Sequence, residues 1–127
     1  MTGPDFEQRP WGQYQVLCRF PLPDAQGKTH DVVIKKITVE PGKRLSYQSH
    51  QGRTEHWYVI TGSGTVLIND KESSVEVGSS IEIPKGTKHR VGSNEKGPLV
   101  FIEVSTGLVD ESDIIRYQDD FGRAPSQ

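Results

Sequence analysis

Apolar residues recur at every second position along most of this chain, as in strands that bury one face. Tyr14, Val16, Cys18 and Phe20 show the spacing near the start. Glycine and proline interrupt the pattern at short, regular intervals, which predicts many short strands in a sandwich or small barrel. The segments with strand character are 13–20, 30–39, 56–62, 64–70, 74–77, 79–84, 88–92 and 99–105.

Turn residues between these segments predict how some of them are connected. Segments 56–62 and 64–70 are expected to pair as a hairpin. A further hairpin is predicted around 79–84, followed by the strand at 88–92. One helical turn is predicted at 117–121. A small barrel with a ligand cavity at one mouth would close such a sheet.

Composition narrows the fold and the function. The 127 residues fit one domain with one moderate core, and 32% apolar residues with 13 glycines and 8 prolines favour strands and turns over a helical bundle. A formal charge of −2 gives no field that would attract nucleic acid or an anionic membrane. We therefore expect neither as a partner.

The cysteine content and the N-terminal sequence predict the cellular compartment of the protein. Cys18 is the only cysteine, which excludes an internal disulfide framework and is compatible with a reducing cytoplasm. The first ten residues are polar and do not read as a signal peptide. No stretch is long and apolar enough for a transmembrane helix. A cytoplasmic protein is therefore expected.

Four polar residues stand at the spacing of a metal site. The run from Gly42 to Gly62 contains Gln48, His50 and Glu55, and His89 follows a second Gly- and Pro-punctuated turn. Gln48 and His50 share one face of a strand, and Glu55 can meet them after the turn. Two imidazoles, a carboxylate and a carboxamide suit a borderline divalent cation. A dry cluster of these groups would be costly to bury, so the metal interpretation outweighs that of two satisfied interior histidines.

These two segments resemble the paired motifs of the cupin superfamily. The first motif matches at every fixed position except Gln48, where most cupins have His. Cupin-type mannose-6-phosphate isomerases carry the same Gln-x-His. The second motif matches through His89 and departs at Ser93, in a turn. The resemblance implies an all-β cupin barrel, a double-stranded β-helix, as a single domain over 1–127.

A closer resemblance is to the C-terminal isomerase domain of bifunctional type II mannose-6-phosphate isomerase/mannose-1-phosphate guanylyltransferases. It covers 9–123, with 124–127 expected to be a frayed tail, and it departs at Gln51-Gly52, where that family usually has His-His. It implies a homodimer, a sugar-phosphate substrate and a divalent metal, with zinc the first expectation and Mn, Co, Ni or Fe the alternatives. The segments that carry it are RPWGQY, PGKRLSYQSHQGRTEHW, IEVSTG and DESDIIRYQDDFGR.

Three further residues are candidates for substrate binding. Lys35 has the strand parity of Ile37, which predicts an inward amine that binds phosphate; a surface lysine is an equal alternative. Arg53 lies in the turn before Glu55 and either reaches the phosphate or stays exposed without a role. Trp57 has the parity of Glu55 and either supports the sugar or packs in the core.

Apart from the predicted metal ligands, Glu103 and Arg116 are the residues predicted to be catalytic. Glu103 interrupts an apolar run, and a carboxylate in such a strand needs a partner or a task. Type I mannose-6-phosphate isomerases resemble this part of the chain and have a Glu and an Arg in the active site at these two positions. The alternative is a structural ion pair between Glu103 and Arg116.

Three functions follow as hypotheses. The first is a metal-dependent isomerase that interconverts mannose 6-phosphate and fructose 6-phosphate, with Glu103 moving the proton and Arg116 stabilising the enediolate. The second is a non-catalytic, metal-containing cupin that binds a sugar or nucleotide sugar. The third, which has less support, is a metal-dependent dioxygenase, because two His and a carboxylate can also hold Fe(II).

Overall fold

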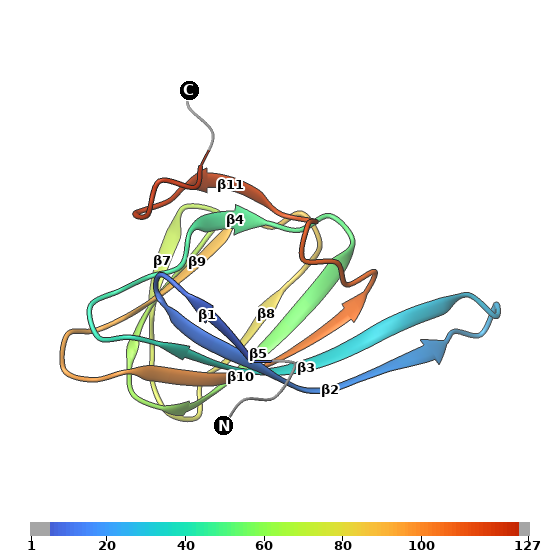
Figure 1. Cartoon of the computed structure of the whole chain (residues 1–127), viewed down its shortest axis with the longest axis horizontal. Helices are drawn as coiled ribbons and strands as arrows, with labels where there is room; N and C mark the ends of the chain where they lie inside the picture. The colour runs from blue at the N-terminus through green and yellow to red at the C-terminus, as the bar shows by residue number, and fades with distance from the viewer. Residues whose placement is uncertain (1–5, 125–127) are drawn as a thin grey trace.

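The computed structural model describes residues 6–124, which form eleven strands in two sheets around one core (Figure 1). All pairings are antiparallel. The six-stranded sheet has the order β1 (Phe6–Arg9), β2 (Gly12–Pro23), β3 (Thr29–Val39), β10 (Leu99–Gly107), β5 (Arg53–Thr61), β8 (Ser80–Ile83). The five-stranded sheet has the order β11 (Ile115–Gln118), β4 (Tyr47–Ser49), β9 (His89–Ser93), β6 (Gly64–Ile68), β7 (Lys71–Val75).

The alternating pattern of β5 decides what faces the core. Glu55, Trp57 and Val59 are buried, whereas His56 and Tyr58 between them are exposed. Val59 packs in the apolar cluster between the sheets, to which both sheets contribute. The strand therefore fixes the core and directs Glu55 to the interior by the same period of two. This all-β arrangement confirms the fold class predicted from the sequence.

The predicted hairpin between 56–62 and 64–70 is wrong. Strand β5 pairs with β10 and β8, whereas β6 pairs with β7 and β9 in the opposite sheet. The turn between them carries the chain from one sheet to the other. Gly62 has a positive φ of 83°, and a Cβ there would collide with the carbonyl of Pro98, so glycine is needed for this crossing.

The second predicted hairpin is wrong for the same reason, because β8 and β9 also lie in different sheets. His89 nevertheless lies on the strand that follows, as expected. The turn residues in the sequence marked the ends of several strands, such as β3 at Val39, but β2 continues to Pro23 and β7 ends at Val75, before the predicted end at 77. They do not determine which strand becomes the hydrogen-bonded partner, since that depends on segments far away in the chain.

The predicted helical turn at 117–121 is also wrong. Tyr117 lies in β11, which pairs with β4 and brings the C-terminal segment over one end of the barrel (Figure 1). A hydrogen bond between the hydroxyl groups of Tyr117 and Ser49, at 2.8 Å, and one from Arg44 to Asp120 hold it there. Of the expected tail, 125–127 lie outside the described residues.

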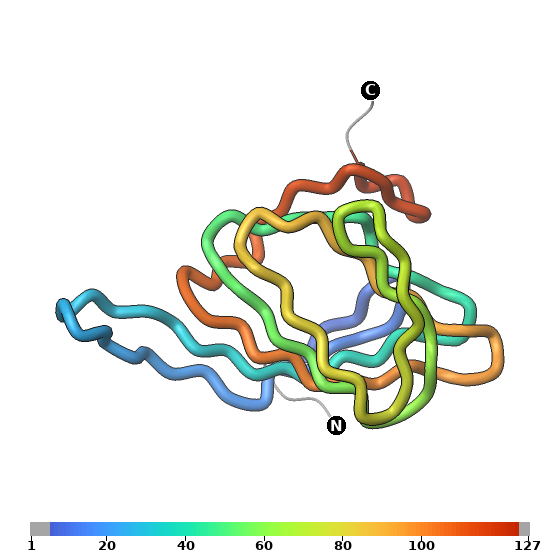
Figure 2. Tube along the Cα trace, turned by 180° about the vertical axis from the view of Figure 1, so that it is seen from behind, coloured from blue at the N-terminus to red at the C-terminus, as the bar shows by residue number. Residues whose placement is uncertain are grey.

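The outer halves of β2 and β3 extend away from the barrel as a long hairpin (Figure 2). The register of β2 shifts between Val16 and Cys18. Tyr14 before the shift is buried, whereas Cys18 and Phe20 after it are exposed, so the alternation no longer points into the core. The homodimer implied by the resemblance stays a prediction. Across residues 6–124 there is no helix with the length and apolarity needed to cross a bilayer.

Because β5 carries both core and site residues, its packing can be tested alone. Val59 is 2% exposed, and Val59→Ala should lower the free energy of unfolding by about 2 kcal/mol, through lost burial and the cavity left behind. Urea unfolding followed by circular dichroism measures the change. Val77→Ala, at a side chain that is 61% exposed, is the matched control. Equal midpoints for the two variants would contradict this core assignment.

Candidate metal centre and cavity

The predicted metal ligands meet at one end of the barrel. Gln48 on β4 lies directly opposite His89 on β9, His50 follows β4, and Glu55 lies near the start of β5. One potential ligand atom from each of His50, Glu55 and His89 lies within 4.8 Å of the others, and all three residues are buried. The fold thus brings residues from both sheets into one group.

Backbone carbonyls orient the two imidazoles. Nδ1 of His50 donates to the carbonyl of Asp113 at 2.7 Å, and Nδ1 of His89 donates to the carbonyl of Thr87 at 3.0 Å. In both rings Nε2 therefore carries the lone pair. Nε2 of His50 lies 3.3 Å from Oε2 of Glu55, and Nε2 of His89 lies 3.9 Å from Oε1 of Glu55. Nε2 of His89 is buried without a hydrogen-bond partner. A divalent cation would satisfy it, so these residues fit a metal.

Electrostatics favour the same protonation state. Burial, and then the charge of Arg53, lowers the pKa of His50 to about 4. Burial also lowers the pKa of His89. Both rings are neutral at pH 7, which is the form that coordinates metals.

Gln48 lies beside His50 on the face that the sequence predicted. Its Nε2 donates to Nε2 of His50 at 3.2 Å, and its Oε1 accepts a hydrogen bond from Oγ of Ser46 at 2.6 Å. A half-turn of the amide exchanges the two atoms, and the Ser46 hydroxyl can donate or accept. Gln48 can therefore offer its oxygen to a cation, as the fourth ligand.

Two neighbours on β5 hold the carboxylate of Glu55. Nε of Arg53 donates to Oε2 at 2.9 Å, and Nε1 of Trp57 donates to Oε1 at 3.0 Å. Arg53 also donates to Nε2 of His50 at 3.2 Å. Arg53 is 5% exposed, which excludes the alternative that it is an exposed turn residue without a role. Trp57 is 2% exposed and packs against Phe101 in the core.

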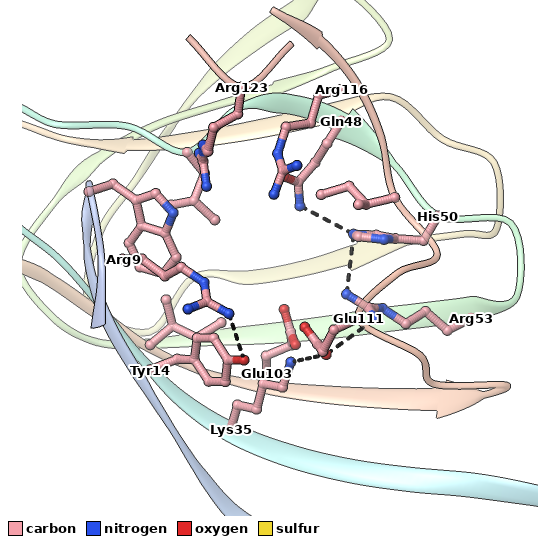
Figure 3. A pocket seen from close by; sticks show the side chains of 14 residues that line it. Arg9, Tyr14, Lys35, Gln48, His50, Arg53, Glu103, Glu111, Arg116 and Arg123 are labelled. Atoms are coloured by element: carbon pink, nitrogen blue, oxygen red, sulfur yellow. Dashed lines mark hydrogen bonds and ion pairs between the residues drawn. The ribbon is translucent and has the colours of Figure 1, made fainter. Parts of the chain in front are cut away.

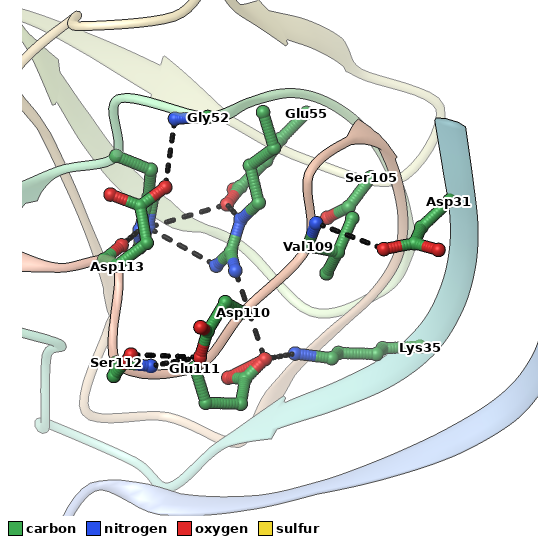
Figure 4. Close-up of polar contacts among 12 residues, drawn as sticks. Asp31, Lys35, Gly52, Glu55, Ser105, Val109, Asp110, Glu111, Ser112 and Asp113 are labelled. Atoms are coloured by element: carbon green, nitrogen blue, oxygen red, sulfur yellow. Dashed lines mark hydrogen bonds and ion pairs between the residues drawn. The ribbon is translucent and has the colours of Figure 1, made fainter. Parts of the chain in front are cut away.

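The turn at Gln51-Gly52, where the sequence departs from the family that it resembles, is held by one carboxylate. Asp113 accepts hydrogen bonds from the backbone N–H of Gln51 at 3.1 Å and of Gly52 at 2.8 Å (Figure 4). A Cβ on Gly52 would lie 2.9 Å from the carbonyl oxygen of Leu108. Glycine thus allows the loop after β10 to pack tightly against this turn.

Lys35 points inward, as its strand parity predicted, and is 3% exposed. Its Nζ donates to Oε2 of Glu111 at 2.8 Å (Figure 4) and lies 4.5 Å from the centre of the Tyr14 ring. Nη1 of Arg53 is 3.7 Å from the same Glu111 oxygen. Glu111 therefore offsets the charges of both buried cations.

Glu103 is buried on β10, where its ladder partners are Lys35 and Trp57. It accepts a hydrogen bond from Oγ of Ser105 at 3.1 Å. Burial, and then the negative charge of Glu55, raises the pKa of Glu103. Within residues 6–124, no ion pair joins Glu103 to Arg116, whose Nε is buried without a partner. The structural ion pair considered as an alternative is therefore absent.

A cavity of about 100 Å³ adjoins the metal-ligand group (Figure 3). Its lining is rich in cations, with Glu103 and Glu111 as the carboxylates. The sequence predicted roles for three of these cations but not for Arg9 and Arg123, although both of these arginines stand in motifs that carry the family resemblance. The cationic side chains that line the cavity are Arg9, Lys35, Arg53, Arg116 and Arg123.

Comparison with known proteins identifies relatives over almost the whole chain. The family described as "Mannose-6-phosphate isomerase C-terminal" matches residues 6–119. The mannose-1-phosphate guanylyltransferase ManC of Salmonella typhimurium is 40% identical over 116 residues, which are 91% of this chain and 22% of that protein. The chain thus spans less than a quarter of this curated relative.

Solved structures agree on the fold. The capsular polysaccharide assembling protein CapF from Staphylococcus aureus superposes with a TM-score of 0.70 at 18% identity, over 89% of this chain and 34% of CapF. A putative sugar phosphate isomerase from Acidithiobacillus ferrooxidans superposes with a TM-score of 0.57 at 26% identity, over 71% of this chain and 60% of that one. The architecture is that of a cupin barrel.

The ligand assignment predicts how histidine variants behave. Purified protein should contain close to one divalent ion per chain, and His50→Ala or His89→Ala should lose it because an imidazole ligand is removed. Elemental analysis after dialysis measures the content. His56→Ala is the matched control, since His56 adjoins Glu55 but is exposed. Retention of metal by both ligand variants, or its loss from the control, would contradict the site.

Proposed function

The chain belongs to the family of mannose-6-phosphate isomerase C-terminal domains, and on this premise we propose that it is a metal-dependent isomerase of mannose 6-phosphate and fructose 6-phosphate. The observation that carries the proposal is Glu103. It is a buried carboxylate that lines a cation-rich cavity beside the His50, Glu55 and His89 group. Sugar-related relatives support the substrate class.

The reaction moves a proton between C1 and C2 of the sugar through an enediol. Gln48, His50, Glu55 and His89 would hold the divalent ion, with zinc as the first candidate. When bound, such an ion polarises the sugar oxygens and stabilises the negative charge that develops on them. Arg53 and Trp57 keep the Glu55 carboxylate fixed by one hydrogen bond to each oxygen.

Glu103 is the proposed proton carrier. It lines the cavity, and its described hydrogen bond comes from the neutral hydroxyl of Ser105 and not from a cation. It can therefore accept the proton from one carbon and return it to the next. Lys35 is its neighbour across the ladder, and the charge of Lys35 is offset by Glu111. Because Glu103 is buried, water has limited access to the proton while it is being transferred.

Arg116 was predicted from the sequence to stabilise the enediolate, and that role stays a prediction. Figure 3 shows Arg116 across the cavity from Glu103, near Gln48, which is its ladder partner. Its guanidinium faces the side of the cavity where Arg9 and Arg123 also point. Its position relative to Glu103 fits contact with another part of the substrate.

A second candidate is the non-catalytic sugar-binding cupin. The turn Gln51-Gly52 favours it, because the imidazoles of the family's usual His-His pair are absent there. The cavity of about 100 Å³ is smaller than the ~300 Å³ or more that is usual for ligand sites, so side chains at its mouth would have to move for either function. No observation in the described part of the chain favours the dioxygenase in a comparable way.

Substitution of Glu103 distinguishes these candidates. Glu103→Gln keeps the size and hydrogen bonding of the side chain but removes the base, so turnover of mannose 6-phosphate should fall about 100-fold or more. A coupled assay on metal-stripped and metal-restored protein measures turnover. Metal content and thermal unfolding should not change.

Glu82→Gln is the control, because Glu82 is an exposed residue on β8 and its variant should keep full activity. Near-normal turnover of Glu103→Gln would refute the assignment of the base. Binding of mannose 6-phosphate by a wild-type protein that shows no turnover, with or without metal, would favour the binding module.

A further inference from the structure

Three arginines from distant parts of the chain point into the same side of the cavity. Arg9 ends β1, Arg116 lies on β11, and Arg123 follows the last turn. All three line the cavity, and Figure 3 shows their guanidinium groups directed to its interior. Side chains of like charge do not gather at one cavity without a reason, because their mutual repulsion opposes folding.

The partners of these arginines leave positive charge uncompensated. Nε and Nη2 of Arg123 donate to the two oxygens of Asp119 at 2.8 and 3.0 Å. Nη2 of Arg9 donates to the neutral Tyr14 hydroxyl at 3.3 Å, and Glu7, 3.8 Å from Arg9, is half-exposed. Solvent screens such an exposed pair strongly. The three guanidinium groups carry three positive charges and Asp119 offsets one of them, so about two positive charges remain uncompensated.

Arg116 has the least compensation of the three. Its Nε is buried without a hydrogen-bond partner. Burial, and then the charges of Arg123 and Arg9, lowers its pKa, while Asp119 acts in the opposite direction. A buried guanidinium N–H without an acceptor is costly. An anion between Arg116 and its two neighbours would satisfy the N–H and relieve the repulsion.

The other two cations that line the cavity already form ion pairs with carboxylates of the protein. Lys35 is paired with Glu111 at 2.8 Å, and Arg53 is paired with Glu55 at 2.9 Å. Their charges are therefore offset within the protein. The uncompensated positive charge of the lining therefore lies with Arg9, Arg116 and Arg123.

We infer that Arg9, Arg116 and Arg123 form the subsite for the phosphate group of a sugar phosphate, an inference that rests on the proposed function. A phosphate monoester carries about −1.5 to −2 charges at pH 7, which matches the charge left by the arginines. Guanidinium groups bind phosphate oxygens through paired N–H donors. The substrate is thereby oriented, with its phosphate at the arginines and C1 and C2 beside Glu103 and the metal ligands.

Calorimetric titration with mannose 6-phosphate, mannose and inorganic phosphate tests this subsite. Arg116→Gln and Arg9→Gln each remove charge-assisted hydrogen bonds, so mannose 6-phosphate should bind roughly tenfold or more weakly. Binding of mannose should not change. Arg116→Lys should be intermediate, because the charge stays but the fork is lost. Inorganic phosphate should compete with mannose 6-phosphate in the wild type and less in the variants.

Two controls make the result specific. Arg19→Gln removes an exposed arginine of the β2 hairpin arm and should leave all affinities unchanged. Lys35→Met tests the position predicted from the sequence. If Lys35→Met weakens the binding of mannose 6-phosphate while both arginine variants bind normally, the subsite is overturned. It is also overturned if the wild type binds neither phosphate ligand, or if the arginine variants lose mannose equally.

The outcomes separate this inference from the proposed function. A wild type that binds mannose 6-phosphate through the arginines but shows no turnover retains the subsite and loses the isomerase. A wild type with turnover whose arginine variants keep normal affinity retains the isomerase and loses the subsite. Thermal unfolding of Arg9→Gln and Arg116→Gln reports folding, and Arg9 and Arg116 lie on different strands, so a defect in one variant does not remove the test.

Discussion

The buried carboxylate of Glu55 is the constraint on which the rest of the site depends. An ionised carboxylate removed from water is tolerated only if each oxygen has partners. Arg53 and Trp57 provide one donor to each oxygen, and both stand two residues away on the same face of β5. The period of the strand thus places the charge and two of its partners together, and the two histidine rings complete its surroundings.

Around this carboxylate the cavity is divided into two electrostatic regions. On the side of the metal-ligand group, every buried cation has a nearby carboxylate, and Glu111 on the loop after β10 serves both Lys35 and Arg53. Arg9, Arg116 and Arg123, by contrast, share one buried acid, Asp119. A polar ligand with one anionic end would be favoured in a single orientation, since reversing it would bring its charge towards Glu55 and Glu103.

The closure of the barrel end by β11 connects the two regions. Pairing with β4 puts Arg116 beside Gln48 in the ladder, so the proposed phosphate contact on β11 is next to a proposed metal ligand on β4. Asp113, just before β11, also binds both ends of the Gln51-Gly52 turn and orients His50 through its carbonyl. Loss of this segment would disturb metal ligands that lie far from it in the sequence.

The sequence by itself determined what depends on neighbours along one strand. The inward positions of Glu55 and Lys35, the outward position of His56 and the meeting of Gln48 with His50 all follow from the period of two and the motif spacing. Only the tertiary structure decided the sheet to which each strand belongs, the pairing of β11 with β4, and the approach of Arg9 to Arg123. The pairs between β11 and β4 join residues more than 60 positions apart. Local pattern carries no information about them, because the hydrogen bonds of a strand edge accept any strand that the packing of the whole chain brings beside it.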